Sequence, residues 1–163
     1  MRQYIMSTRF YRILIFFSAI LFMSPLMLFK DYAAAENTID IGDSSSSFIT
    51  TKAWEMYNKK EYTSALVYAE KCIELYNSEA IAQQESLARY PEKKDISKYW
   101  ALNDVGTCYY IAGLASLEMN RNEQAQGYFT FIIESLPYAS CWDPKGWYWK
   151  VSPEANKELQ KFK

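Results

Sequence analysis

The segment with the most unusual chemistry lies near the C-terminus and reads Cys-Trp-Asp-Pro-Lys-Gly-Trp-Tyr-Trp over residues 141–149. Asp143, Pro144 and Gly146 suit the first, second and fourth places of a type I turn, which predicts an aromatic loop. Flat rings offer a large contact area at a low cost in conformational entropy. Exposed rings in this loop would form a platform for a sugar ring or for an aromatic peptide anchor.

The same rings could instead fold back and seal the end of the domain. Alternate side chains of an extended strand share one side. Trp147 and Trp149 therefore lie together and are expected to be buried, and Trp142 and Tyr148 are the expected exposed pair. The rings are therefore expected to seal the domain, and Trp142 and Tyr148 are the candidate aromatic platform if the loop binds a ligand instead.

The rest of the chain offers little catalytic chemistry. It contains no histidine, so the most common general base and metal ligand is absent. Glu70 and Glu74 lie one helical turn apart, but Lys71 and polar neighbours make them a solvated face. Cys141 has no histidine to act as its base, and the chain has no Gly-rich phosphate loop, G-x-S-x-G or C-x-x-C. The sequence predicts a non-catalytic protein without a cofactor or metal.

Two stretches, residues 53–76 and 109–137, share one template of an aromatic-rich helix, a short polar turn and a second helix that opens on alanine. Ala53 and Ala65 occupy the small positions of the first stretch, and Gly113 and Ala125 those of the second. Helices can cross closely where side chains are small, so each stretch is expected to form a helical hairpin. The two second-helix alanines are 60 residues apart.

This template resembles the tetratricopeptide repeat, whose pattern is W-x2-L-G-x2-Y, then A-x3-F, then P. The second stretch keeps Ala125, Phe129 and Pro137 but has Tyr109 in place of tryptophan, and the first has Ala69 where phenylalanine would stand. The resemblance implies two degenerate repeats over residues 48–163. The fold would be all-α, an α-solenoid fragment of stacked helical hairpins with a C-terminal capping helix.

The resemblance also implies a concave groove formed by the first helix of each hairpin. The candidate partner-binding residues that point into it are Trp54, Tyr57, Asn58, Tyr110, Leu114 and Leu117. Family members that grip a C-terminal carboxylate use Lys, Asn and Arg in this groove. The matching places here hold Thr50, Trp54, Thr107 and Ile111, so such a clamp is not expected. An apolar, hydrogen-bonding groove suits an extended or helical partner segment, unless lengthened helices fill it themselves.

The 60-residue spacing exceeds the roughly 34-residue period of the repeat and fits an insertion over residues 80–105; a degenerate middle repeat is the alternative. Helix formers over residues 78–89 extend the second helix until Pro91 ends it. The next helix is expected to begin near Asp95 or Ser97, and another covers residues 123–135.

At the C-terminus, Ser152 as cap and Pro153 in the first helical position start a helix. Its apolar face would cover the open end of the stack. That face comprises Ala155, Leu159 and Phe162.

Cys72 and Cys108 fall on neighbouring helices of the stack that the resemblance implies. In a compartment that permits disulfides these two side chains could form a bridge. Alternatively, both are small buried hydrophobic residues, as free cysteines usually are.

Residues 1–35 have the features of an export signal of a bacterial protein. Arg2, Arg9 and Arg12 precede the apolar run 13–29, and residues 33–35 are an Ala-Ala-Ala cleavage site. The alternative is an uncleaved membrane anchor, since the 17-residue run is at the short end of a spanning helix. Residues 36–47 lack hydrophobic periodicity and are expected to be a flexible lead. The expected location is periplasmic or extracellular.

Without residues 1–35 the chain has 14 basic and 18 acidic side chains, a net charge of −4. Phosphate binding needs a basic surface, so nucleic acid is not an expected partner, nor is the membrane after signal cleavage. The sequence predicts an exported interaction module, a scaffold or adaptor for another protein or peptide. The alternative is a carbohydrate- or cell-wall-binding accessory protein that uses the aromatic loop on a polysaccharide.

Overall fold

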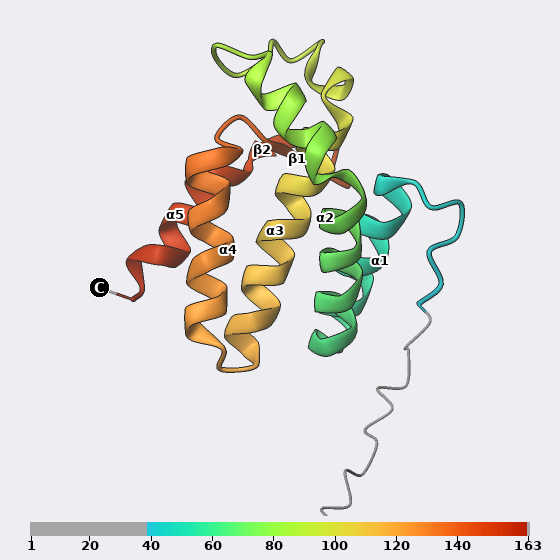
Figure 1. Cartoon of the computed structure of the whole chain (residues 1–163), viewed down its shortest axis with the longest axis vertical. Helices are drawn as coiled ribbons and strands as arrows, with labels where there is room; N and C mark the ends of the chain where they lie inside the picture. Colours follow the sequence, from blue (N-terminus) through green and yellow to red (C-terminus); the bar gives the residue numbers. More distant parts are fainter. Residues whose placement is uncertain (1–38, 163) are drawn as a thin grey trace, which may run out of the picture. The chain divides into compact units, whose positions relative to one another are not determined.

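The computed structural model describes residues 39–162, which are mainly helical, with five α-helices, one 3-10 helix and a two-stranded sheet in this part of the chain (Figure 1). The helices are α1 (Ser46–Asn58), α2 (Tyr62–Glu85), η1 (Ile96–Lys98), α3 (Trp100–Glu118), α4 (Asn122–Ser135) and α5 (Val151–Gln160), and the strands are β1 (Ser140–Asp143) and β2 (Trp147–Lys150). The predicted mainly helical fold is confirmed at this level. The predicted export signal over residues 1–35 lies outside the described residues. The flexible lead predicted over residues 36–47 is corrected at its end, because Ser45 caps α1 and residues 46 and 47 belong to that helix.

The turns that join α1 to α2 and α3 to α4 have the same backbone geometry. Lys60 and Asn120, 60 residues apart, adopt left-handed φ angles of 62° and 59°. Each turn is closed by the two backbone hydrogen bonds of a Schellman motif. The donor and acceptor pairs are Lys60 to Tyr57 and Glu61 to Met56 in the first turn, and Asn120 to Leu117 and Arg121 to Ser116 in the second, all at 2.8–2.9 Å. Both polar turns predicted from the sequence are therefore present and alike.

The second hairpin packs closely through a glycine and a phenylalanine. A Cβ atom added to Gly113 would lie 2.4 Å from Cε1 of Phe129, and Phe129 is fully buried. The nearest neighbour of Gly113 is thus the Phe129 ring, one turn beyond the predicted partner Ala125. The missing side chain of Gly113 leaves the space that the ring occupies.

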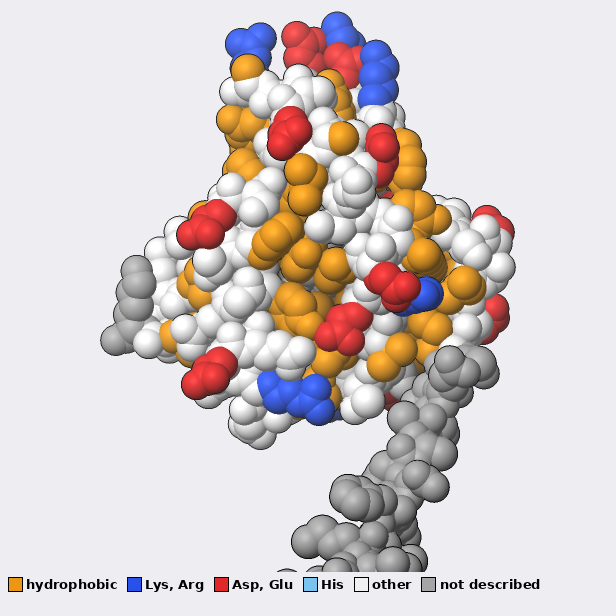
Figure 2. Space-filling view, viewed as in Figure 1, with side chains coloured by type: hydrophobic (Ala, Val, Ile, Leu, Met, Phe, Trp, Pro, Cys, Tyr) orange, Lys and Arg blue, Asp and Glu red, His pale blue; other side chains and the backbone are white. Residues whose placement is uncertain are grey.

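Helix α3 lies at the centre of the helical layer and contacts α1, α2, α4 and α5. Its side chains are buried almost all round the helix, from Ala101 to Ser116, as expected of a helix covered on every side. Figure 1 shows α2, α3 and α4 side by side. Figure 2 shows hydrophobic side chains gathered along the middle of the face that these helices form, with charged side chains around them.

The insertion is partly helical. Helix α2 continues past residue 78, as predicted, but ends at Glu85 with Ser86 as its C-cap, several residues before Pro91, which corrects the predicted end of this helix. Helix α3 begins at Trp100, later than Asp95 or Ser97, which corrects that prediction. The carbonyl oxygen of Asp95 accepts a hydrogen bond from the Lys98 N–H at 3.0 Å, so this segment closes the 3-10 turn η1 instead of starting an α-helix.

Helix α5 follows β2 directly and begins at Val151, so Ser152 is already inside the helix and does not cap it. Val151 and Ala155 are fully buried, and Leu159 and Phe162 are partly buried against the core. Helix α5 contacts α4 and α3. Within residues 39–162, no helix combines the length and the apolar character needed to cross a membrane.

Candidate binding cavity

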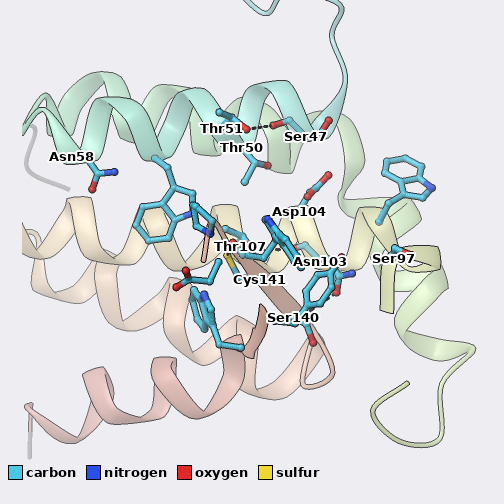
Figure 3. A pocket seen from close by; sticks show the side chains of 17 residues that line it. Ser47, Thr50, Thr51, Asn58, Ser97, Asn103, Asp104, Thr107, Ser140 and Cys141 are labelled. Atoms are coloured by element: carbon cyan, nitrogen blue, oxygen red, sulfur yellow. Dashed lines mark hydrogen bonds between the residues drawn. The ribbon is translucent and has the colours of Figure 1, made fainter. Parts of the chain in front are cut away.

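A cavity of about 660 Å³ opens between α1, α3 and the β1–β2 hairpin (Figure 3). This volume lies within the roughly 300–1,000 Å³ range of ligand pockets. Figure 3 shows the labelled side chains of α1 facing those of α3 and the hairpin across the open space. The first helix of each predicted hairpin therefore contributes one wall, and the aromatic loop contributes the third.

The two helical walls follow from helical spacing. Side chains three, four or seven residues apart lie on one face of a helix. The lining residues of α1 are Ser47, Thr50, Thr51, Trp54 and Asn58, and those of α3 are Trp100, Asn103, Asp104 and Thr107.

The third wall is a tight β-hairpin. Strands β1 and β2 pair antiparallel, with Trp142 opposite Tyr148 and Asp143 opposite Trp147. The Gly146 N–H donates to the Asp143 carbonyl oxygen at 2.9 Å, as expected for the predicted type I turn, and Gly146 has a left-handed φ of 96°. A type I turn followed by a left-handed residue is a common three-residue hairpin connection.

The exposure of the aromatic rings agrees with the prediction for Trp142 and corrects it for the rings of β2: Trp147 was expected to be buried, Trp149 was expected to be more fully buried, and Tyr148 was expected to be exposed. Trp147 is 48% exposed and Trp142 is 54% exposed, and Tyr148 and Trp149 are half-buried. Trp147, predicted to be buried, projects into solvent because it follows the turn at the outer end of the ribbon. Trp149 packs edge-on against Tyr110 of α3, with ring centroids 5.4 Å apart. The sealing role therefore falls on Trp149.

Four of the five tryptophans in the chain line this one cavity. They come from α1, α3 and both strands: Trp54, Trp100, Trp142 and Trp149. The rings of Trp142 and Tyr148 contact each other edge to face at 4.9 Å. Only Trp147 lies outside the lining, although it belongs to the same hairpin.

The structure brings the two predicted sites together. Trp54 and Asn58 of the partner-binding set and both platform residues, Trp142 and Tyr148, line the cavity. The remaining partner-binding residues do not line it. They are Tyr57, Tyr110, Leu114 and Leu117, all half-buried against the core. The lengthened helices do not fill this space, and the hairpin forms its third wall.

Sequence reasoning missed Trp100 and Asp104 as lining residues. The sequence does contain a pattern that could have identified them, because residues 100, 103, 104 and 107 have the spacing of one helical face. Thr50, Trp54 and Thr107, noted at positions of the carboxylate clamp, do line the cavity, whereas Ile111 is fully buried.

Asp104 is a partly buried carboxylate in the cavity wall. Burial raises the pKa of its carboxyl group above the ordinary value of 3.8, and a hydrogen bond from Ser46 Oγ opposes this rise. Among the ion pairs of residues 39–162, none involves Asp104 or the hairpin carboxylate Asp143. The cavity lining contains no lysine or arginine, so its fixed charge is negative.

Several polar groups of the lining already donate their hydrogens within the protein. Thr51 Oγ1 donates to the Ser47 carbonyl oxygen and Thr107 Oγ1 to that of Asn103, each at 2.7 Å. Asn103 Nδ2 donates to the Ile96 carbonyl oxygen at 2.8 Å. These three donors are therefore used within the protein, whereas the carboxylates of Asp104 and Asp143 are acceptors in the cavity lining.

The cysteines are buried free thiols. Thr50 Oγ1 lies 3.5 Å from Cys72 Sγ and 3.1 Å from Cys108 Sγ, so the two cysteines considered for a bridge share one hydroxyl neighbour as free thiols. Burial raises the pKa of the Cys141 thiol, which lowers its thiolate fraction and makes it a poor nucleophile. Among residues 39–162, no group of three His, Cys, Asp or Glu side chains is placed to hold a metal ion.

Neither a protein-family model, nor a curated protein, nor a solved structure matches this chain.

Proposed function

We propose that the protein is an exported, non-catalytic interaction module of the tetratricopeptide-like kind, which binds a segment of a partner protein in the cavity between α1, α3 and the hairpin. The observation that carries this proposal is the gathering of four of the five tryptophans around one cavity. Tryptophan is enriched at the centres of interfaces, because a large ring in a desolvated pocket contributes much of the binding free energy.

The repeat class is supported by the two hairpins. Their Schellman turns are 60 residues apart and close with equivalent hydrogen bonds. Contacts between α1 and α3 join residues 58 apart, as in Ser46 with Asp104 and Thr50 with Cys108. The spacings of 60 residues between the turns and of 58 residues between contacting positions are nearly equal. Stacked copies of one helical unit produce such near-equal spacings.

Export is supported by the arginine-flanked apolar run and the alanines of residues 1–35. The mature protein would begin at Glu36 and act in the periplasm or outside the cell. Intact mass of the protein recovered from the cell envelope tests this. Recovery of the uncleaved chain in the membrane fraction would favour an anchor instead.

Selection from a random peptide display library on the immobilised full-length chain tests partner binding. The selected peptides are then titrated against the wild type, Trp142→Ala and Trp147→Ala. The two rings are similarly exposed and lie on one hairpin, but only Trp142 lines the cavity. Trp142→Ala should weaken binding at least about tenfold, as loss of an interface hot spot does, and Trp147→Ala should leave it unchanged. Failure to enrich any peptide, or equal loss in both variants, would contradict the proposal.

A carbohydrate-binding accessory role is the second candidate, favoured by the exposure of Trp142 and Trp147. Exposed rings can stack on sugar rings, which buried rings cannot. In this case retention on insoluble peptidoglycan or polysaccharide should fall in both Trp142→Ala and Trp147→Ala. The second variant therefore separates the two candidates.

A further inference from the structure

The charge of the cavity limits what it can hold. Its charged side chains are Asp104 and Asp143, with no lysine or arginine in the lining. The two carboxylates of the lining attract a cation and repel an anion or a C-terminal carboxylate.

The hydrogen-bond acceptor capacity of Asp104 also favours a cationic ligand group. Thr51, Thr107 and Asn103 donate to backbone carbonyl groups of the protein, and Ser46 supplies the hydrogen bond that Asp104 accepts. A carboxylate accepts up to four hydrogen bonds, so Asp104 retains acceptor capacity. A ligand group with several donors can therefore bind this carboxylate.

The walls are aromatic and suit a flat cation. Trp142 and Tyr148 meet edge to face at 4.9 Å, and Trp54 and Trp100 line the two helical walls. Aromatic faces attract cations through the ring quadrupole, and desolvation strengthens this attraction. A guanidinium group can stack on such a face and still donate to a carboxylate at its edge.

We propose that the partner segment bound in the cavity places an arginine side chain there, with Asp104 as its counter-ion and the tryptophan rings as its walls. This rests on the proposed peptide-binding function and names the chemistry of the segment. Arginine fits better than lysine, because its planar group offers five donors and sheds water more readily than an ammonium group does. It fits better than a neutral sugar, because a sugar leaves the carboxylate without a charged partner.

The test uses two soluble peptides, acetyl-Gly-Ser-Arg-Ser-Gly-amide and the same peptide with citrulline in place of arginine. Citrulline keeps the size and planarity of the side chain but carries no charge. Both peptides are titrated into the full-length chain and followed by tryptophan fluorescence. We expect the arginine peptide to bind at least about tenfold more tightly than the citrulline peptide, which corresponds to about 1.4 kcal/mol.

Asp104→Asn should abolish this tenfold preference while the protein stays folded, as checked by thermal denaturation. Glu134→Gln is the matched control, because it removes one negative charge at an exposed position of α4 outside the cavity. It should keep the preference.

Equal binding of the two peptides, or the same loss in Glu134→Gln as in Asp104→Asn, would overturn the arginine site. Display-selected peptides that bind the cavity without any basic residue would also overturn the arginine site. This outcome would leave the proposed peptide-binding function intact. Binding of oligosaccharides with no binding of any peptide would overturn both proposals.

Discussion

The carboxylate of Asp104 lies in the cavity wall with Ser46 Oγ as its hydrogen-bond donor and no cationic partner among the described residues. Burial raises its pKa above the ordinary value of 3.8. A carboxyl group with a raised pKa in the folded state destabilises the fold once it ionises. Groups that cost stability and face a cavity are frequently functional, which is consistent with a role for Asp104 in binding.

Asp104→Asn should therefore raise the stability of the protein at neutral pH. Between pH 3.8 and the higher folded-state pKa, the folded protein binds more protons than the unfolded chain, so stability falls as pH rises through this window. The cost is fully present above the window and absent below it. Melting temperatures of wild type and variant should differ near pH 7 and converge below about pH 3.8. A variant less stable than the wild type near pH 7 would contradict this account of Asp104.

Two helical glycines allow a matched test of the packing in the second hairpin. A Cβ at Gly113 would lie 2.4 Å from the Phe129 ring, whereas a Cβ at Gly127 would have no neighbour within 4 Å. Gly113→Ala should destabilise the protein, by about 1–3 kcal/mol if the ring has to shift. Gly127→Ala should stabilise it by roughly 0.5–1 kcal/mol, because alanine favours the helix. Chemical denaturation of both variants measures the difference, and equal effects would show that Phe129 does not occupy the space beside Gly113.

At the scale of elements, the hairpin is both a wall of the cavity and a cover for α3. Trp149 contacts Tyr110 of α3, and Trp142 and Tyr148 face the cavity. Trp147 does not take part in this contact and is exposed. Within one short hairpin, Trp149 therefore packs against the helices, whereas Trp147, two residues earlier, does not.

The two rings should respond differently to truncation. Trp149→Ala should destabilise the fold, by less than the roughly 3–5 kcal/mol of a fully buried ring because Trp149 is half-buried. Trp147→Ala should change stability by no more than about 0.5 kcal/mol, as surface changes usually do. Urea denaturation provides both values. A larger loss for Trp147 than for Trp149 would show that the hairpin packs in another way.

Much of the helical framework could be predicted from the sequence, because it depends on local signals. Each of these signals depends on residues close together in the sequence: the polar turns around Lys60 and Asn120, the helix-forming run up to Glu85 and the turn at Asp143. The start of α3 was predicted too early, since Asp95 has the composition of a cap but closes a 3-10 turn. The exposure of Trp147 was also predicted wrongly, because two-stranded ribbons twist strongly and alternation alone does not fix which rings are covered.

At the scale of the whole described domain, the cavity is formed by elements far apart in the sequence. Trp54 and Trp142 were assigned to two separate candidate sites, and the structure places them around one space. No periodicity within α1 or within the hairpin could show this, since it depends on the hairpin folding back over the first helices. Trp100 lies in the insertion, where the repeat pattern gave no guide.

The five tryptophans provide a direct test of the central claim, because four line the cavity and Trp147 does not. The measurement is the set of indole N–H resonances of the full-length chain, recorded by NMR while a display-selected peptide is added. We predict that the resonances of Trp54, Trp100, Trp142 and Trp149 shift together and saturate, and that of Trp147 stays in place. A shift confined to Trp147, or saturable peptide binding that leaves the other four resonances unmoved, would contradict a binding site between α1, α3 and the hairpin.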